Sequence, residues 1–247
     1  MKRMNNMLTG FVELEPVRGL LVLIAMLCVQ CMTAQPYASP TATYWNAEEE
    51  SDVTLDAGDN TTTNAPCELR LASNLGDAAG WRAVCEWRIY KTADGVDKPM
   101  ITRFEEQTTV MLTQSGGYGI KLFVTLTDMS NSSNVVELEC DPITVNITES
   151  RLSCPDGFSP NDDGINDVWR VTYQSIVKMD GVIFNRWGQK VYSFNLSNVD
   201  QGWDGRWKGD YVKDGVYYLN LQAVGSDGVK YDIKKALNVL TGYRETR

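Results

Sequence analysis

The stretch AVCEWRI, residues 83–89, decides the fold of the first half of this 247-residue chain. Cys85, Trp87 and Ile89 alternate with charged neighbours, so an extended segment has one apolar and one polar face. Similar short segments with turn residues between them lie at residues 67–71, 109–112, 118–126, 136–140 and 143–147. No long segment with a helical period follows residue 34. The pattern predicts an all-β chain with an antiparallel β-sandwich over residues 67–150.

Composition excludes several classes of function. The chain has 23 Lys and Arg, 32 Asp and Glu, and no His, which gives a net charge of −9. This acidic balance argues against a nucleic-acid partner, whose binding surface is basic. Without His, the Ser-His-Asp and Cys-His catalytic arrangements and His-ligated zinc are excluded. We therefore expect no enzymatic activity.

The charge divides the chain into two halves. Residues 35–150 hold 7 basic and 18 acidic residues, net −11, and residues 151–247 hold 13 and 12, net +1. This change predicts a domain boundary near residues 149–155. Residues 35–66 are expected to form a polar acidic spacer, with a first strand around residues 53–55. Residues 151–247 are expected to form a second antiparallel sandwich in tandem with the first.

Residues 1–34 are typical of a signal peptide. Lys2, Arg3 and Arg18 precede an apolar run at residues 19–29, which suits export better than membrane spanning. Cleavage is expected after Ala34. The alternatives are a buried helix, a signal anchor, a later start at Met7, or a lipoprotein modified at Cys28 or Cys31.

The exported part keeps Cys67, Cys85, Cys140 and Cys154. An even number of cysteines in an exported chain predicts two disulfides. Three pairings are open, and the expected ends of the strands favour Cys67–Cys154. The alternative is that some of these cysteines are buried free thiols.

Four ordered motifs mark the second half: FSPNDDGIND at 158–167, NRWG at 185–188, WDG at 203–205 and KDGVYYL at 213–219. In this order they resemble the gliding-motility-associated C-terminal domain, the type B sorting domain of type IX secretion in Bacteroidota. Asp162 departs from the family pattern, which usually has Gly there. The residues that carry the resemblance are Phe158, Pro160, Asn161, Asp163, Gly164, Asn166, Asp167, Asn185, Arg186, Trp187, Gly188, Trp203, Asp204, Gly205, Gly215 and Tyr217.

The same motifs also have a structural interpretation. NRWG separates two strand patterns, as does GSDG at residues 225–228, so both predict hairpin turns. We expect Trp203 to cover an edge of the core and Asp204 to bond local backbone amides. In the first half, Trp87 and the Gly117-Tyr118 opening of a later strand resemble an immunoglobulin-like or polycystic-kidney-disease-like module of surface proteins.

The loop at residues 158–167 is a candidate calcium site. Asn161, Asp163, Asp167 and the carbonyl of Ile165 offer hard oxygen ligands around Gly164. It is not an EF-hand, because Thr172 stands where that loop has its bidentate Glu. The alternative is an Asx-rich turn that bonds its own backbone.

The resemblance implies an exported cell-surface or secreted protein whose C-terminal domain is recognised by the type IX translocon and by a PorP/SprF-like outer-membrane protein. Recognition is expected at the loops 158–167 and 203–208. A periplasmic docking module is an alternative. Another is a carbohydrate-binding or adhesive module, for a glycan or surface protein, with Trp203 and Trp207 as the platform. An enzyme using Glu105-Glu106 or Asp162-Asp163 is the least favoured, because adjacent strand residues point to opposite faces.

Overall fold

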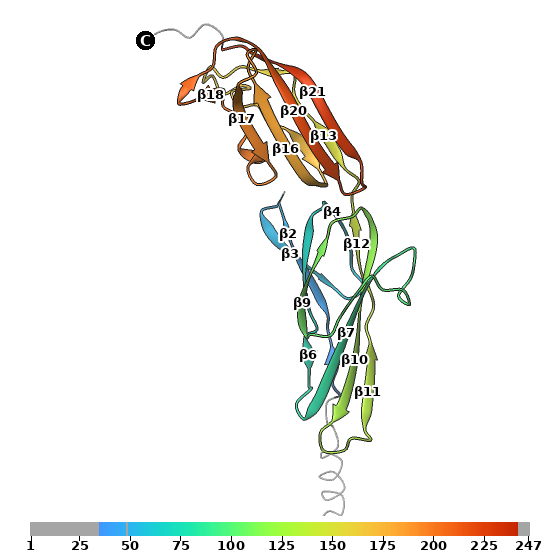
Figure 1. Cartoon of the computed structure of the whole chain (residues 1–247). Helices are drawn as coiled ribbons and strands as arrows, with labels where there is room; N and C mark the ends of the chain where they lie inside the picture. The colour runs from blue at the N-terminus through green and yellow to red at the C-terminus, as the bar shows by residue number, and fades with distance from the viewer. Residues whose placement is uncertain (1–34, 48, 242–247) are drawn as a thin grey trace, which may run out of the picture. The chain divides into compact units, whose positions relative to one another are not determined.

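The computed structural model describes residues 35–47 and 49–241, and this part of the chain is almost entirely β (Figure 1). The predicted signal peptide lies outside the described residues. No helix among the described residues is long and apolar enough to cross a membrane.

The first half consists of two facing sheets around one core. One sheet has the strand order β3-β2-β5-β9. The other has the order β4-β12-β10-β7-β8, with β11 also paired to β10. The strands of the two sheets and the short pair β1-β6 are β1 (Tyr37–Ala38), β2 (Thr41–Asn46), β3 (Ser51–Asp56), β4 (Asn60–Thr63), β5 (Cys67–Ala72), β6 (Leu75–Gly76), β7 (Trp81–Lys91), β8 (Ile101–Arg103), β9 (Gln107–Leu112), β10 (Gly116–Asp128), β11 (Val135–Glu139) and β12 (Ile143–Ile147).

Alternation in the sequence explains this core. Cys85, Trp87 and Ile89 of β7 are buried, and Trp87 is fully inaccessible to solvent. Tyr118 at the start of β10 donates its hydroxyl proton to the carbonyl of Gln114, 2.8 Å away. This bond to a backbone group four residues upstream is the tyrosine corner of immunoglobulin-like sandwiches.

The predicted spacer at residues 35–66 is wrong. Strands β1 to β4 lie in this segment, and β2 forms a central strand of its sheet between β3 and β5. Ala42 and Tyr44 are buried in the core, while the alternate positions carry Thr and an exposed Trp45. Threonine counts as a polar residue, yet it is favoured in half-buried strands. The high threonine content therefore made residues 35–66 resemble a spacer and concealed the alternation of buried and exposed positions. The expected strand at residues 53–55 lies within β3.

The second half is built on one five-stranded sheet with the order β14-β21-β20-β16-β17. In β20, Tyr217, Leu219 and Leu221 are buried and the residues between them are exposed. Two short pairs, β13-β15 and β18-β19, accompany the sheet. The elements of this half are β13 (Arg151–Ser153), β14 (Gly157–Phe158), β15 (Thr172–Gln174), β16 (Ile176–Phe184), β17 (Lys190–Asn195), the 3₁₀ helix η2 (Val199–Gln201), β18 (Arg206–Trp207), β19 (Asp210–Tyr211), β20 (Gly215–Gly225) and β21 (Lys230–Val239).

Both predicted hairpin turns of the second half are confirmed. Residues 185–188 join β16 to β17, and residues 225–228 join β20 to β21. Tyr217 donates to the carbonyl of Lys213 at 2.9 Å, which repeats the tyrosine corner of the first half. The two halves have separate buried clusters that share no buried residue.

The four described cysteines are free thiols, so the favoured Cys67–Cys154 disulfide is not formed. The reason is that Cys67 belongs to the first buried cluster and Cys154 packs against the second. Cys85 lies opposite Val124 of β10, and the amide of Cys140 bonds Leu122 from the other side of that strand. One strand therefore separates these two cysteines, and two inter-strand spacings of about 4.8 Å each already exceed the roughly 7 Å reach of a disulfide.

Candidate functional site

Three of the four motifs meet inside the second half. The ring of Phe158 lies 5.3 Å from that of Trp203, and Trp203 lies 5.6 Å from Tyr217 in an edge-on contact. All three side chains are buried. We call these three residues the motif core. The FSPN, WDG and GVYY motifs are therefore linked by packing, which explains their residue types without any ligand.

Gly205 and Pro160 strengthen this link. Gly205 has φ +76°, a conformation that favours glycine, and a Cβ atom there would lie 2.7 Å from the Pro160 ring. The WDG turn accordingly needs its glycine for both conformation and space. Asp204 accepts a hydrogen bond from the amide of Arg206 at 3.0 Å, as expected for a turn.

The candidate calcium loop is satisfied by its own hydrogen bonds. Both carboxylate oxygens of Asp167 accept backbone N–H groups, from Asn161 (2.9 Å), Asp162 (2.7 Å) and Gly164 (2.7 Å). Desolvation alone would raise the pKa of Asp167, but these hydrogen bonds outweigh it and lower the pKa.

The remaining proposed ligands also have partners within the loop. The Asp163 carboxylate accepts the amide of Ile165 at 2.8 Å, and the Ile165 carbonyl accepts a bond from Ser159. In the described part of the chain, no three His, Cys, Asp or Glu side chains are grouped to hold a metal. The geometry is that of an Asx-rich turn, and it gives the calcium prediction no support.

The NRWG turn differs from the other motifs because it combines a buried and an exposed part. Asn185 is buried, and its Oδ1 accepts the amides of Trp187 and Gln189 at 3.0 Å each. Its Nδ2 donates to Gln189 Oε1 at 2.9 Å. Gly188 completes the turn with φ +75°. Asn185 thus holds the turn from inside while the next two side chains point outward.

Arg186 and Trp187 are the exposed part of this turn. Trp187 is 70% exposed, whereas Trp203 is 1% exposed. The guanidinium of Arg186 lies 4.7 Å from the centre of the Trp187 ring. Such a pair fixes the cation over the aromatic face. Among the aromatic side chains of the four motifs, Trp187 has the largest exposed fraction and is absent from the buried cluster.

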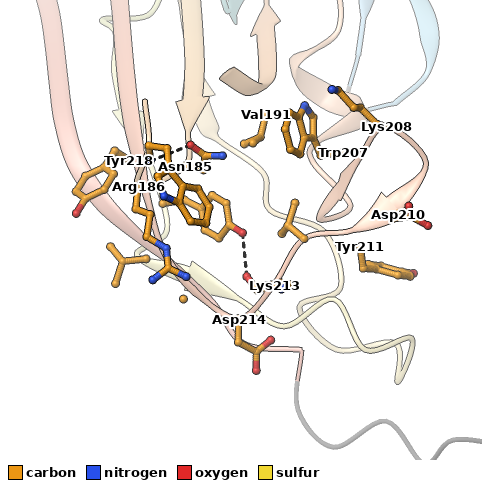
Figure 2. A pocket seen from close by; sticks show the side chains of 15 residues that line it. Asn185, Arg186, Val191, Trp207, Lys208, Asp210, Tyr211, Lys213, Asp214 and Tyr218 are labelled. Carbon is orange, nitrogen blue, oxygen red and sulfur yellow. Dashed lines mark hydrogen bonds between the residues drawn. The ribbon is translucent and has the colours of Figure 1, made fainter. Parts of the chain in front are cut away.

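A pocket of about 600 Å³ lies beside this turn (Figure 2). In Figure 2, Arg186 and Tyr218 lie on one side, and Trp207, Lys208 and Tyr211 lie on the other. We call it the basic aromatic pocket. Its polar and aromatic lining residues are Asn185, Arg186, Trp187, Trp207, Lys208, Asp210, Tyr211, Lys213, Asp214, Tyr217 and Tyr218.

Charges around the pocket are held in defined places. Lys208 lies 4.7 Å from the Trp207 ring centre, and Arg206 lies 4.1 Å from that of Tyr211. Hydrogen bonds from Thr241 lower the pKa of Asp214, which therefore stays ionised. Three cations, Arg186, Lys208 and Lys213, line the pocket against two carboxylates, Asp210 and Asp214, so it can accept an apolar ligand whose negative charge lies near the cations.

The sequence predicted only some of the residues that line this pocket. Of the two loops expected to make contacts, residues 203–208 supply Trp207 and Lys208, and residues 158–167 supply none of the lining. Tyr211, Lys213 and Tyr218 were not predicted as contact residues, although Lys213 and Tyr218 lie in the KDGVYYL motif. The neighbouring cation–aromatic pairs Arg186-Trp187 and Trp207-Lys208 were the available signal in the sequence.

The proposed glycan platform of Trp203 and Trp207 is wrong. Trp203 is buried, and its indole N–H donates to the carbonyl of Arg206 at 2.9 Å. Trp207 is half-buried in the pocket wall. Trp203 points inward because its large apolar ring packs against Phe158 and Tyr217 in the motif core.

The comparison with family models decides the assignment of the second half. The model of the CHU_C type IX secretion signal domain matches residues 152–237. Residues 152–237 are a type IX secretion signal domain. This match supports a sorting role in type IX secretion for a cell-surface or secreted protein. The comparison with curated proteins gives no match.

Three solved structures are similar at low levels. Latent PorU from Porphyromonas gingivalis matches with 14% identity and a TM-score of 0.24, covering 87% of this chain and 21% of PorU. A tetra-tandem repeat of a large adhesion protein matches with 10% identity and a TM-score of 0.23, covering 84% of this chain and 68% of that one. The FN1–FN3 domains of chicken CNTN1 match with 10% identity and a TM-score of 0.24, covering 80% of this chain and 76% of that one. At such TM-scores these likenesses carry no argument about this chain.

Proposed function

We propose that the chain is a non-catalytic exported protein and that the type IX machinery recognises its signal domain at the Arg186–Trp187 turn and the basic aromatic pocket. The observation that carries this proposal is the contrast in exposure between Trp187, 70% exposed, and the buried Phe158 and Trp203. The buried motif residues are explained by folding. An exposed aromatic beside a cation is the kind of group that anchors a protein interface.

The loop at residues 158–167 is a weaker contact region. Its carboxylates are engaged with backbone amides of the same loop. Ile165 is exposed in this loop, and no residue of the loop lines the basic aromatic pocket. We therefore place recognition at the turn rather than at this loop.

The route of export and the partner belong to the same proposal. The segment 1–34 directs the chain to the periplasm, and a PorP/SprF-like outer-membrane protein receives the signal domain. The first half is then the part displayed at the surface. The resemblance of the four motifs to type B sorting domains supports this partner, and the family match supports the sorting role.

Whole-cell protease treatment tests the proposal in the host. The tagged full chain is compared with Arg186→Ala, Trp187→Ala and the double variant. Trp45→Ala serves as a control that removes another largely exposed Trp, in the first half. We expect protease to cut the unmodified chain and the control at the surface, and the double variant to stay protected inside the cell.

Two outcomes contradict the proposal. If the double variant is cut as efficiently as the unmodified chain, the machinery does not read this turn. If the unmodified chain is itself protected in intact cells, the protein is a periplasmic docking module. Circular dichroism of each purified variant shows whether a loss of export reflects a loss of folding.

A further inference from the structure

The loop between β8 and β9 presents an apolar side chain beside two carboxylates. Phe104 is 63% exposed, and Glu105 and Glu106 are exposed next to it. Neither glutamate forms an ion pair with a residue of the described segments. We call residues 104–106 the FEE loop. It combines the two properties that complement a basic aromatic pocket.

The FEE loop is held in place by the core beneath it. The indole N–H of Trp87 donates to the carbonyl of Glu105 at 3.1 Å. The amide of Ser73 donates to the carbonyl of Glu106 at 2.9 Å. A loop that is already ordered loses little conformational entropy when it binds, so it is suited to serve as one side of an interface.

The basic aromatic pocket offers the matching groups. Three cations, Arg186, Lys208 and Lys213, line it together with the carboxylates of Asp210 and Asp214, so the lining has a net positive charge of one. None of the three cations forms an ion pair within the described part of the chain. The rings of Trp187 and Trp207 provide apolar surface under two of these cations. A phenyl ring can enter such a pocket while its neighbouring carboxylates meet the cations at the rim.

The contrast in charge favours contact between unlike halves of two copies, because two copies of the acidic first half repel each other. Residues 35–150 carry a net charge of −11 and residues 151–247 a net charge of +1. Opposite charges on the two contacting surfaces guide encounter and orientation. We propose that the FEE loop of one copy docks in the basic aromatic pocket of a second copy.

This contact joins the FEE loop of one copy to the pocket of another. In a pair of copies, one FEE loop and one pocket therefore remain unoccupied. A contact of this kind continues from copy to copy unless the arrangement closes into a ring. The exported chain would therefore form assemblies of more than two copies through this one type of contact. The inference uses the same pocket as the export proposal, but it is tested separately, because self-association is measured on the purified chain and the FEE loop lies outside the signal domain.

Sedimentation velocity of residues 35–247 tests self-association. We expect the sedimentation coefficient to rise with protein concentration at about 0.1 M NaCl, and the rise to shrink at about 1 M, where screening shortens from about 10 Å to about 3 Å. Phe104→Ser with Glu105→Gln and Glu106→Gln should weaken association at least about tenfold, as should Arg186→Gln with Lys213→Gln.

Mixing the two variants gives a sharper result. The loop variant keeps an intact pocket and the pocket variant keeps an intact FEE loop, so together they should form pairs that do not grow further. The matched control is Glu49→Gln with Glu50→Gln, which removes two exposed negative charges from another part of the first half. The control should associate like the unmodified chain.

Three results overturn the inference. The first is a chain that stays monomeric at every concentration, and the second is a loop variant that associates normally. The third is a control variant as weak as the loop variant, which would indicate general charge attraction. A monomer that binds polygalacturonate through Arg186 and Lys213 would instead assign the pocket to an acidic glycan. The loop variant should be exported normally, so failure here is separable from failure of the export proposal.

Discussion

Trp169 and Trp203 are joined by a pair of backbone hydrogen bonds, in which each amide donates to the carbonyl of the other residue at 2.9 Å. Both side chains are buried. The indole N–H of Trp169 donates to the carbonyl of Pro155, and that of Trp203 donates to the carbonyl of Arg206. This bridge fastens two irregular segments to the core of the signal domain, and it explains why WDG is a structural motif.

Replacing Trp203 with Ala should destabilise the protein by about 3–5 kcal/mol, because the change leaves a large cavity in the motif core. Trp187→Ala should change the free energy of unfolding by less than about 0.5 kcal/mol, since its side chain is exposed. Urea unfolding of the two variants measures both values. A similar effect of the two substitutions would contradict the assignment of a structural and a surface Trp.

Asn185→Ala should cost about 1–3 kcal/mol, because the amides of Trp187 and Gln189 lose the acceptor that holds the turn. It should also reduce surface exposure of the tag in the whole-cell assay, since the exposed turn is no longer fixed. Gln189→Ala is the control, because it leaves the Oδ1 contacts of Asn185 in place. Equal loss of stability in both variants would show that Asn185 has no special role.

Asp167→Asn should make stability less dependent on pH. The pKa of Asp167 is lowered from its ordinary value of 3.8 in the folded protein. The charged carboxylate therefore stabilises the fold above that value, and this contribution is lost as the pH falls through the folded-state pKa. Urea unfolding from neutral to acid pH should show the unmodified chain and the variant converging in acid. Parallel curves would contradict this.

Addition of calcium should leave the melting temperature unchanged. A calcium ion would have to replace the backbone N–H groups that already occupy both oxygens of Asp167. Calorimetric melting with calcium, with magnesium and with a chelator measures the effect. A rise with calcium alone that disappears in Asp163→Asn would restore the original calcium prediction.

Thiol labelling should find four free cysteines in the chain from residue 35 onward. Burial raises the pKa of the Cys67 thiol to about 11, so it is almost entirely protonated at neutral pH. Iodoacetamide should label Cys67 only after unfolding, and a reducing agent should not change the number of labels. Mass spectrometry without reduction gives the count. A mass lower by two hydrogens per cysteine pair would reveal a disulfide.

Local patterns in the sequence were sufficient for the fold class and for the family of the second half. Alternation placed Trp87 in the core, and the NRWG and GSDG segments at residues 185–188 and 225–228 predicted hairpin turns. Strand alternation and hairpin turns depend on residues that are close together in the sequence. The same reasoning failed for residues 35–66, where the threonines of β2 concealed a half-buried strand.

Only the tertiary structure decided which motif residues face solvent. Trp187 and Trp203 stand in similar turn motifs, yet one is exposed and the other is buried, because the core beside Trp203 is supplied by Phe158 and Tyr217 from distant parts of the chain. The disulfide prediction failed for the same reason. Contacts between residues far apart in sequence set burial, and a single sequence does not show which distant residues become neighbours.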